Sequence, residues 1–278
     1  ALWSRVEEPL KAISAKHNGE ACCEWFGPDG AGHFVKTIHN GIEYADMQMI
    51  AEAYGVMRDG LGMQAGEIGA VFQRWNEGPL GSFLIEITGQ TAQIADPETG
   101  KPLLDVIQDK AGQKGTGRWS VIEAQHLAAP ASTIEAAVVA RNISSRKDAR
   151  EEMEALFGAA PTELGDALGD RNATLHALEQ ALIAGKIACY AQGFEVFKAA
   201  SATYEWGLDY AAIARVWRAG CIIRSVFLDD IARVLDEDSD AHLMATPFFA
   251  DLMRDNQGGL RNTVAACATH GLPAPALS

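Results

Sequence analysis

Apolar residues recur every three or four positions between about residues 33 and 58, a spacing that predicts one amphipathic helix. The residues on one face of this helix are apolar, and we expect them to pack into a core: Val35, Ile38, Ile42, Ala45 and Met49. The other face is polar and combines five different side-chain types: Lys36, His39, Asn40, Glu43 and Tyr44. The stretch therefore predicts a helix that buries one side and leaves the other free to line a site.

Similar spacing continues along the chain and predicts a mainly α fold. Further helices are expected over about 64–75, 80–95, 119–128, 131–155, 172–205, 209–218, 220–236 and 246–269. Three of them begin at residues suited to a helix start: Ser132 with Glu135 as a capping box, Asp209, and Thr246 followed by Pro247. We expect residues 30–278 to form one all-α domain.

The first 29 residues show a different order of elements. Apolar spacing predicts a helix over 2–16, and the run 21–26, which contains Cys22 and Cys23, predicts a short buried strand before a turn at 27–30. Helix, strand and turn in this order are typical of the last unit of a nucleotide-binding sheet.

Composition narrows the class of protein. Of the 278 residues 48% are hydrophobic, and the net charge of −14 argues against general binding to nucleic acid or to acidic membranes. The most apolar long stretch, 175–203, holds too many charges for a membrane span: Glu179, Lys186, Glu195 and Lys198. Five cysteines without CxxC spacing indicate a reducing, cytoplasmic setting, and the histidines show no metal-binding spacing.

The polar face of the 33–58 helix is unusual for a solvated surface, because each residue differs in chemical type. Lys36 and Glu43 are two turns apart, too far for the pairing at i,i+4 that stabilises helix surfaces, so they could flank a bound molecule. A solvated face is the alternative.

Two features suit a phosphate group. The run KGTGRW (114–119) combines small residues, which let the backbone approach an anion, with the Lys114 charge and the Thr116 hydroxyl. Arg141, in an otherwise apolar helix, has a planar guanidinium group that suits a phosphate. A glycine-rich surface turn and an ion-paired arginine are the respective alternatives. GLGMQA (60–65) is read as a turn between helices and not as a dinucleotide motif, because a helix precedes it where the motif needs a strand.

The run GAGHFVKTIHNGIEYADMQ (30–48) resembles the signature helix of 6-phosphogluconate dehydrogenase, the NADP-linked family that oxidatively decarboxylates 6-phosphogluconate to ribulose 5-phosphate. Similar matches follow in the family's order: SFLIEIT (82–88), QKGTGRW (113–119), ARNISS (140–145), YAQG (190–193) and WRAGCIIRS (217–225). The resemblance implies that residues 1–29 end an NADP-binding Rossmann-type domain and that residues 30–278 form the helical domain of a homodimer.

The resemblance also implies roles for single residues. Lys36 would be the base and Glu43 the acid, His39 and Asn40 would orient the sugar acid, and Lys36 and Asn40 would lie beside the NADP nicotinamide. The phosphate would be bound by the remaining candidates: Tyr44, Lys114, Thr116 and Arg141. In this scheme no metal is needed.

The proposed chemistry sets conditions on the two catalytic groups. An unperturbed lysine has a pKa of about 10.4, so a base at this position must be a neutral amine with a lowered pKa. A carboxyl that donates a proton must have its pKa raised by desolvation.

Departures from the family are mild at Arg118, where lysine is usual, and at Ala45, where glycine is common. The coenzyme fingerprint and the tail that reaches the other subunit are expected outside residues 1–278, so this chain is expected to be inactive alone.

Two alternative functions are another β-hydroxyacid dehydrogenase, of the 3-hydroxyisobutyrate type, and a non-catalytic helical dimerisation module.

Overall fold

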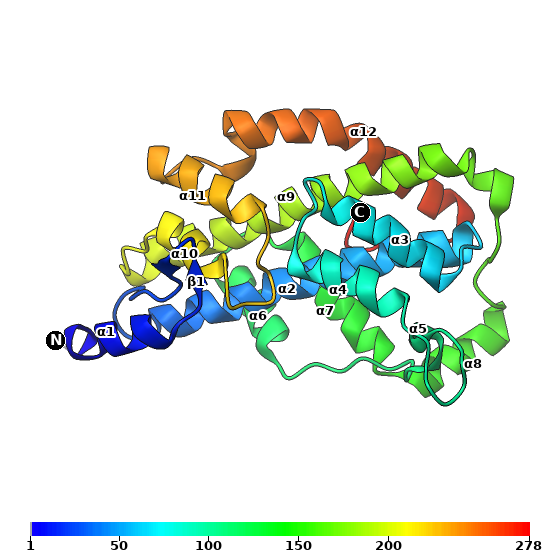
Figure 1. The fold of residues 1–278 in the computed structure, drawn as a ribbon, viewed down its shortest axis with the longest axis horizontal. Helices are drawn as coiled ribbons and strands as arrows, with labels where there is room; N and C mark the ends of the chain where they lie inside the picture. Colours follow the sequence, from blue (N-terminus) through cyan, green and yellow to red (C-terminus); the bar gives the residue numbers. More distant parts are fainter. Residues whose placement is uncertain (1) are drawn as a thin grey trace.

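The structure, a computed structural model, describes residues 2–278 and is built almost wholly of helices (Figure 1). Their bounds, with the short strands and turns between them, are α1 Trp3–Ile13, β1 Lys16–His17, β2 Glu20–Ala21, α2 Ala31–Gly55, the π-helical turn η1 Val56–Gly60, α3 Ala65–Asn76, α4 Phe83–Ala92, α5 Leu103–Val106, α6 Thr116–His126, α7 Ser132–Ser144, α8 Lys147–Phe157, η2 Gly165–Leu168, α9 Arg171–Tyr204, α10 Tyr210–Trp217, α11 Phe227–Glu237, η3 Leu243–Ala245 and α12 Pro247–His270. This confirms the mainly α fold expected from the spacing.

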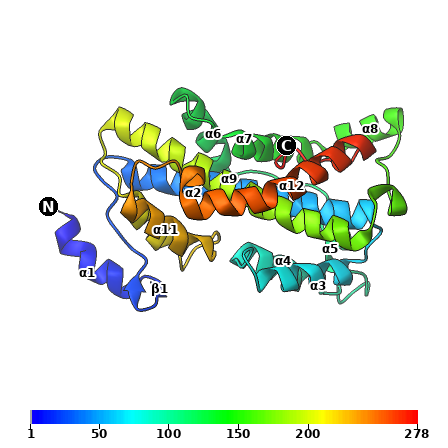
Figure 2. The ribbon, with the colours of Figure 1, turned by 90° about the horizontal axis from the view of Figure 1, so that it is seen from above.

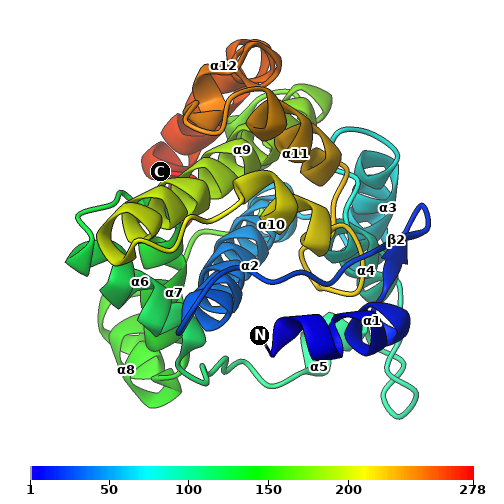
Figure 3. The ribbon, with the colours of Figure 1, turned by 90° about the vertical axis from the view of Figure 1, so that its left-hand side faces the viewer.

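Helix α2 forms the centre of the domain. Figure 3 shows it enclosed by α9, by α6 and α7, and by α4, and each of these helices contacts it. Its apolar face is buried as expected, with Ile38, Ile42 and Met49 fully inaccessible. Two glycines of α9 allow the close approach: a Cβ on Gly193 would lie 2.5 Å from Ile42, and one on Gly185 would lie 2.5 Å from Met49. Shape, as well as hydrophobicity, therefore sets the α2–α9 contact.

Helix α12 covers the other side of α9, along which it runs (Figure 2). Gly259 permits this contact, because a Cβ there would lie 2.4 Å from Gln180 of α9. The segment after α12 folds back onto α2, where the Glu52 carboxylate accepts hydrogen bonds from the backbone N–H groups of Ala276 and Leu277. No helix among residues 2–278 combines the length and apolar character needed to cross a membrane.

Two of the expected helix starts are confirmed. The Asp209 carboxylate accepts a hydrogen bond from Ala212 N–H, and Pro247 occupies the first turn of α12. The turn assigned to GLGMQA is confirmed as well, because it joins the end of α2 and η1 to α3.

The expected single helix over 131–155 is wrong, and so is its capping box. The helix is interrupted after Ser144, where Arg150 donates a hydrogen bond to the freed Ser144 carbonyl and the Ser145 hydroxyl donates to Asn142 O. At the start of α7 the Thr133 N–H is capped by Gln192 of α9. A residue distant in sequence therefore replaces the local cap.

Two other expectations fail for the same kind of reason. Residues 220–226 are not helical, because Val226 N–H bonds to Gly81 O and Arg224 O accepts from Phe83 N–H, which holds this segment beside the start of α4. The strand over 21–26 is reduced to Glu20–Ala21, paired with Lys16–His17 in a hairpin. The strand ends at Ala21, because a strand persists only where a neighbour supplies hydrogen bonds. Cys22 and Cys23 follow it and are half-buried. Helix α5 was not expected.

Candidate active site

The polar face of α2 carries a chain of side-chain contacts. Lys36 Nζ lies 3.1 Å from His39 Nδ1, which lies 3.2 Å from Asn40 Oδ1. Asn40 Nδ2 then donates a 3.1 Å hydrogen bond to the Thr116 hydroxyl at the start of α6. Four of the residues singled out from the sequence are thus joined, although Thr116 is far from the others along the chain.

Small residues bring α6 onto this face. A Cβ on Gly117 would lie 2.6 Å from the Tyr44 ring, and one on Gly41 would lie 2.8 Å from Ser120, so neither position leaves room for a larger side chain. The Ser120 hydroxyl donates a 2.7 Å hydrogen bond to Thr37 O and so fastens α6 to α2. Gly115, just before α6, has a φ of +108°, which favours glycine and turns the 112–116 loop toward α2.

Arg141 reaches the same region from α7. Its guanidinium carbon lies 4.6 Å from the centre of the Tyr44 ring, a cation–π contact, and its Nη1 donates a 2.9 Å hydrogen bond to Gly112 O. Ala111 N–H also bonds to the Ser144 hydroxyl, so α7 holds the loop at two points. Lys114 lies on this loop with its side chain exposed.

Glu43 lies within electrostatic reach of two basic groups, Lys36 and Arg141. Burial raises the pKa of its carboxyl above the ordinary value of 4.5, while the positive charges of Lys36 and Arg141 oppose that rise. The structure therefore brings Lys36, Glu43 and Arg141 within electrostatic reach of one another. The direction of the shift is the one that a proton-donating carboxyl requires.

Its place on the polar face of α2 suggested that His39 would be exposed and face the substrate. The structure buries it instead. Only 1% of its surface is exposed, and its ring meets the edge of Trp217 at a centroid distance of 5.4 Å. Burial, with a smaller contribution from the Lys36 charge, lowers the pKa of His39 to about 4. The ring is therefore neutral near pH 7 and contacts Lys36 and Asn40. Its role toward the sugar acid stays a prediction.

The buried ring has a consequence for stability at low pH. In the unfolded chain His39 binds a proton as the pH falls through about 6.5, whereas in the folded chain it does so only near 4. Between these values the unfolded state holds more protons, so the free energy of unfolding should fall by about 3 kcal/mol on acidification. Urea unfolding from pH 7 to 4 should show this loss in the wild type and in His126→Gln, whose side chain is exposed, but not in His39→Gln. Parallel pH profiles for all three proteins would contradict it.

Some residues at the site were not identified from the sequence. Ser120 and Trp217 contact the α2 face as described above, and Cys221 lies close enough to Lys36 for that charge to act on the thiol, whose pKa burial raises. Trp217 and Cys221 belong to the run 217–225, which carried the family resemblance but no pattern that pointed to α2.

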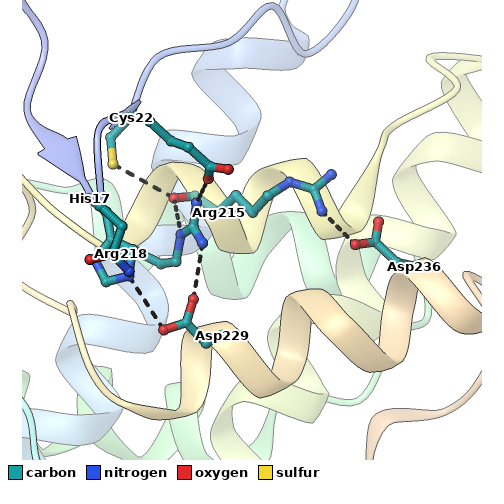
Figure 4. A network of polar contacts seen from close by, with 8 residues as sticks. His17, Cys22, Arg215, Arg218, Asp229 and Asp236 are labelled. Atoms are coloured by element: carbon teal, nitrogen blue, oxygen red, sulfur yellow. Dashed lines mark hydrogen bonds and ion pairs between the residues drawn. The ribbon is translucent and has the colours of Figure 1, made fainter.

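Two arginines near Cys221 join neighbouring elements through ion pairs (Figure 4). Arg215 pairs with Asp236 at 2.7 Å, and Arg218 pairs with Asp229 at 3.0 Å and with Glu20 of the hairpin. Arg224 instead lies over the Phe83 ring, 3.7 Å from its centre.

The residues present fit one end of the NADP that the resemblance implies. Lys36 is exposed and Asn40 half-buried, and their amine and carboxamide are suitable partners for the nicotinamide end. In the described part of the chain the only sheet is the β1–β2 hairpin, so these residues alone do not supply a dinucleotide-binding sheet. Among residues 2–278 no three His, Cys, Asp or Glu side chains are grouped as metal ligands.

Known proteins are similar to this chain in sequence and in fold. A sequence model described as "6-phosphogluconate dehydrogenase, C-terminal domain" matches residues 32–278. The chain is 48% identical over 277 residues to 6-phosphogluconate dehydrogenase, decarboxylating 2, of Saccharomyces cerevisiae, covering 99% of this chain and 56% of the yeast protein. It is 44% identical over 274 residues to the NADP(+)-dependent decarboxylating 6-phosphogluconate dehydrogenase of Bacillus subtilis, covering 98% of this chain and 58% of that protein.

The fold is similar to that of Plasmodium falciparum 6-phosphogluconate dehydrogenase, with a TM-score of 0.95 and 39% identity, covering 99% of this chain and 59% of the other. That enzyme is described in its apo form and in complexes with NADP+ and with 6-phosphogluconate. The chain spans about half the length of the curated relatives it matches. Because the family match includes the polar face of α2, the 112–116 loop and Arg141, this chain belongs to the 6-phosphogluconate dehydrogenase family, and its residues 32–278 correspond to the C-terminal domain.

Proposed function

We propose that this chain is the substrate-binding part of an NADP-dependent enzyme that oxidatively decarboxylates 6-phospho-D-gluconate to D-ribulose 5-phosphate and CO2. The observation that carries the proposal is that Glu43 lies within electrostatic reach of Lys36 and Arg141, while Asn40 bonds to the Thr116 hydroxyl and Arg141 lies over the Tyr44 ring. This arrangement supports a base, an acid and a phosphate-binding group in one region. The decarboxylating relatives and the TM-score of 0.95 to an enzyme of this type support it.

Lys36 is the general base of the proposed reaction. Its amine accepts the proton of the secondary hydroxyl at the carbon β to the substrate carboxylate. Lys36 and Asn40 would lie beside the nicotinamide end of NADP, which would supply the hydride acceptor for this oxidation. Neutral His39 contacts the Lys36 amine and so helps to hold it in place, and Asn40 in turn contacts the His39 ring.

Glu43 is the proposed acid. The β-keto acid loses CO2 readily because its carbonyl takes up the electrons of the breaking carbon–carbon bond. As CO2 leaves, protonated Lys36 returns its proton to the carbonyl oxygen, which gives an enediol. Glu43 in its protonated form then donates a proton to the carbon that carried the carboxylate, while Lys36 takes the proton back from the oxygen and the ketone forms. Burial of Glu43 raises its pKa and thereby increases the protonated fraction available at neutral pH.

Arg141, Tyr44, Thr116 and Lys114 are proposed to bind the phosphate. Arg141 is held by its contacts with Gly112 O and the Tyr44 ring, so little conformational freedom remains to be lost on binding. The assignment of Lys114 rests on its position in the same loop and on the family resemblance.

A second copy of the chain is the proposed partner, and the cytoplasm the proposed location. Large apolar side chains on adjacent helices are exposed: Trp119 and Ile122 on α6, and Val139 and Ile143 on α7. Such surface is typical of an interface.

The described cysteines are all free thiols, which suits a reducing compartment such as the proposed cytoplasm.

The experiment that tests the function measures turnover in a complete enzyme that contains this chain. We expect NADP-linked turnover of 6-phosphogluconate with release of CO2, and at most weak turnover of 3-hydroxyisobutyrate. The opposite preference would favour the other β-hydroxyacid dehydrogenase, and no turnover of either substrate would favour a helical dimerisation module.

Arg141→Ala tests the phosphate assignment in the same assay. Loss of a charge-assisted pair should raise the KM for 6-phosphogluconate by about 10- to 100-fold, with little change for unphosphorylated gluconate. Exposed Arg146, replaced by alanine, is the matched control and should leave both constants unchanged. If Arg141→Ala leaves the preference for the phosphorylated substrate intact, the phosphate lies elsewhere.

A further inference from the structure

A buried ion pair joins α2 to α9 about one turn of α2 beyond Glu43. Asp46 Oδ2 of α2 is 3.1 Å from Lys186 Nζ of α9, and their side chains are only 5% and 2% exposed. Lys186 Nζ also donates a 3.0 Å hydrogen bond to the Ser82 hydroxyl at the start of α4. A buried pair of this kind is weak evidence for stability, because two apolar residues of similar size are often at least as stable. Its role is therefore better sought in what it positions.

The pair belongs to a larger set of contacts, which we term the buried polar cluster: Asp46, Ser82, Lys186, Tyr190 and Ser225. Tyr190 follows Lys186 by one turn of α9, and its hydroxyl donates a 2.9 Å hydrogen bond to Ile223 O and lies 3.4 Å from the Ser225 hydroxyl. Ser225 in turn forms an isolated bridge with Ser82. The cluster thus ties α2, α4, α9 and the segment 221–226 together at one place.

The buried polar cluster holds two elements that place the surroundings of Lys36: α2, which carries it, and the segment 221–226. Asp46 lies three residues after Glu43 on the same helix, and each residue of an α-helix turns by about 100°, so a fixed Asp46 also fixes the direction of Glu43 and Lys36. The segment 221–226 begins at Cys221, which lies within electrostatic reach of Lys36. A rotation of α2 would therefore move the amine and the carboxyl together relative to α6 and α7.

We propose that the buried polar cluster positions the reacting groups: it sets the rotation of α2 and the place of the segment 221–226, so that Lys36 and Glu43 meet the substrate in productive geometry. This inference rests on the proposed function for the identity of the reaction. Asp46 and Lys186 are positioning residues, because both side chains are buried in their own ion pair and act on the reaction through α2.

The test compares Lys186→Met and the double variant D46N/K186M with wild type in a complete enzyme that contains this chain. Both should lower kcat by about 10- to 100-fold, since small displacements of reacting groups cost this much. The KM for 6-phosphogluconate should change less than about threefold, because three of the four proposed phosphate-binding residues, Lys114, Thr116 and Arg141, lie outside α2. Lys198→Met is the matched control on α9, since Lys198 pairs with Glu195 away from α2, and it should behave as wild type.

The double variant separates positioning from stability, because it leaves no buried unpaired charge. If it unfolds at the wild-type temperature and keeps kcat within twofold of wild type, the cluster has only a structural role and the inference is wrong. Tyr190→Phe provides a milder variant should Lys186→Met fail to fold; it removes one hydroxyl and should lower kcat without a matching rise in KM.

A second measurement does not depend on the reaction. The rate at which Lys36 is labelled by an amine reagent, followed by mass spectrometry, should change at least about threefold in the double variant and stay constant in Lys198→Met, because a turned α2 alters the surroundings of the amine. An unchanged labelling rate would overturn the inference even if wild type did not turn over 6-phosphogluconate. Absence of wild-type turnover, with an altered labelling rate, would instead reject only the proposed function.

Discussion

Replacement of Lys36 by methionine is expected to lower kcat for 6-phosphogluconate by about 10²- to 10⁴-fold, the usual contribution of a general base. Methionine keeps the alkyl stem but has no amine to accept the hydroxyl proton. Binding of the substrate should change little, because Arg141, Thr116 and Lys114 lie on other elements. Steady-state kinetics and calorimetric titration of the variant in a complete enzyme measure the two quantities separately.

Lys36→Met should also raise the pKa values of two neighbouring groups. The Lys36 charge lowers the pKa of both His39 and Glu43, so both pKa values should rise when that charge is removed. Lys198→Met is the control and should keep wild-type turnover, because the Lys198 amine pairs with Glu195 and with the backbone carbonyl of Ala241. A Lys36→Met enzyme with kcat within tenfold of wild type would show that another group is the base.

Replacement of Glu43 by alanine is expected to slow the overall reaction by about 10²-fold or more, but to slow hydride transfer much less. The variant should therefore form about one equivalent of NADPH per site rapidly, followed by slow turnover while the enediol awaits a proton. Stopped-flow absorbance of NADPH, compared with the release of ribulose 5-phosphate, distinguishes the two steps.

The pH dependence provides a further check on Glu43. Burial raises its pKa, so the proton-donating form is lost as the pH rises through that raised value, and the wild-type protonation step should slow accordingly. Glu43→Ala should lack this dependence. Glu123→Gln, on the outer part of α6, should retain both the rate and the pH profile of wild type. Unchanged overall turnover in Glu43→Ala would remove this residue from the mechanism.

Much of the helical framework could be read from local patterns. The apolar spacing of α2 predicted its buried face correctly, because a helix in a core must place Ile38, Ile42 and Met49 on one side. The cap at Asp209 and the proline at the start of α12 were also correct. These features depend on residues within one or two turns of each other. The roles of the polar residues came from resemblance to a family, not from spacing.

The site itself needed contacts between distant segments. Spacing put His39 on the polar face of α2, yet the Trp217 ring covers it, and the resulting burial lowers its pKa. No local pattern linked Thr116 to Asn40, a contact that depends on the room left by Gly117.

The sequence by itself determined most of the helical segments and which chemical groups α2 presents, because both follow from the order of side chains along a regular backbone. Only the tertiary structure decided that Gln192 of α9 would cap the start of α7, that residues 220–226 would run beside the start of α4, and that Asp46 would pair with Lys186. Each of these contacts joins residues far apart in the chain, and its partner is selected by packing of the whole core, which local spacing does not specify.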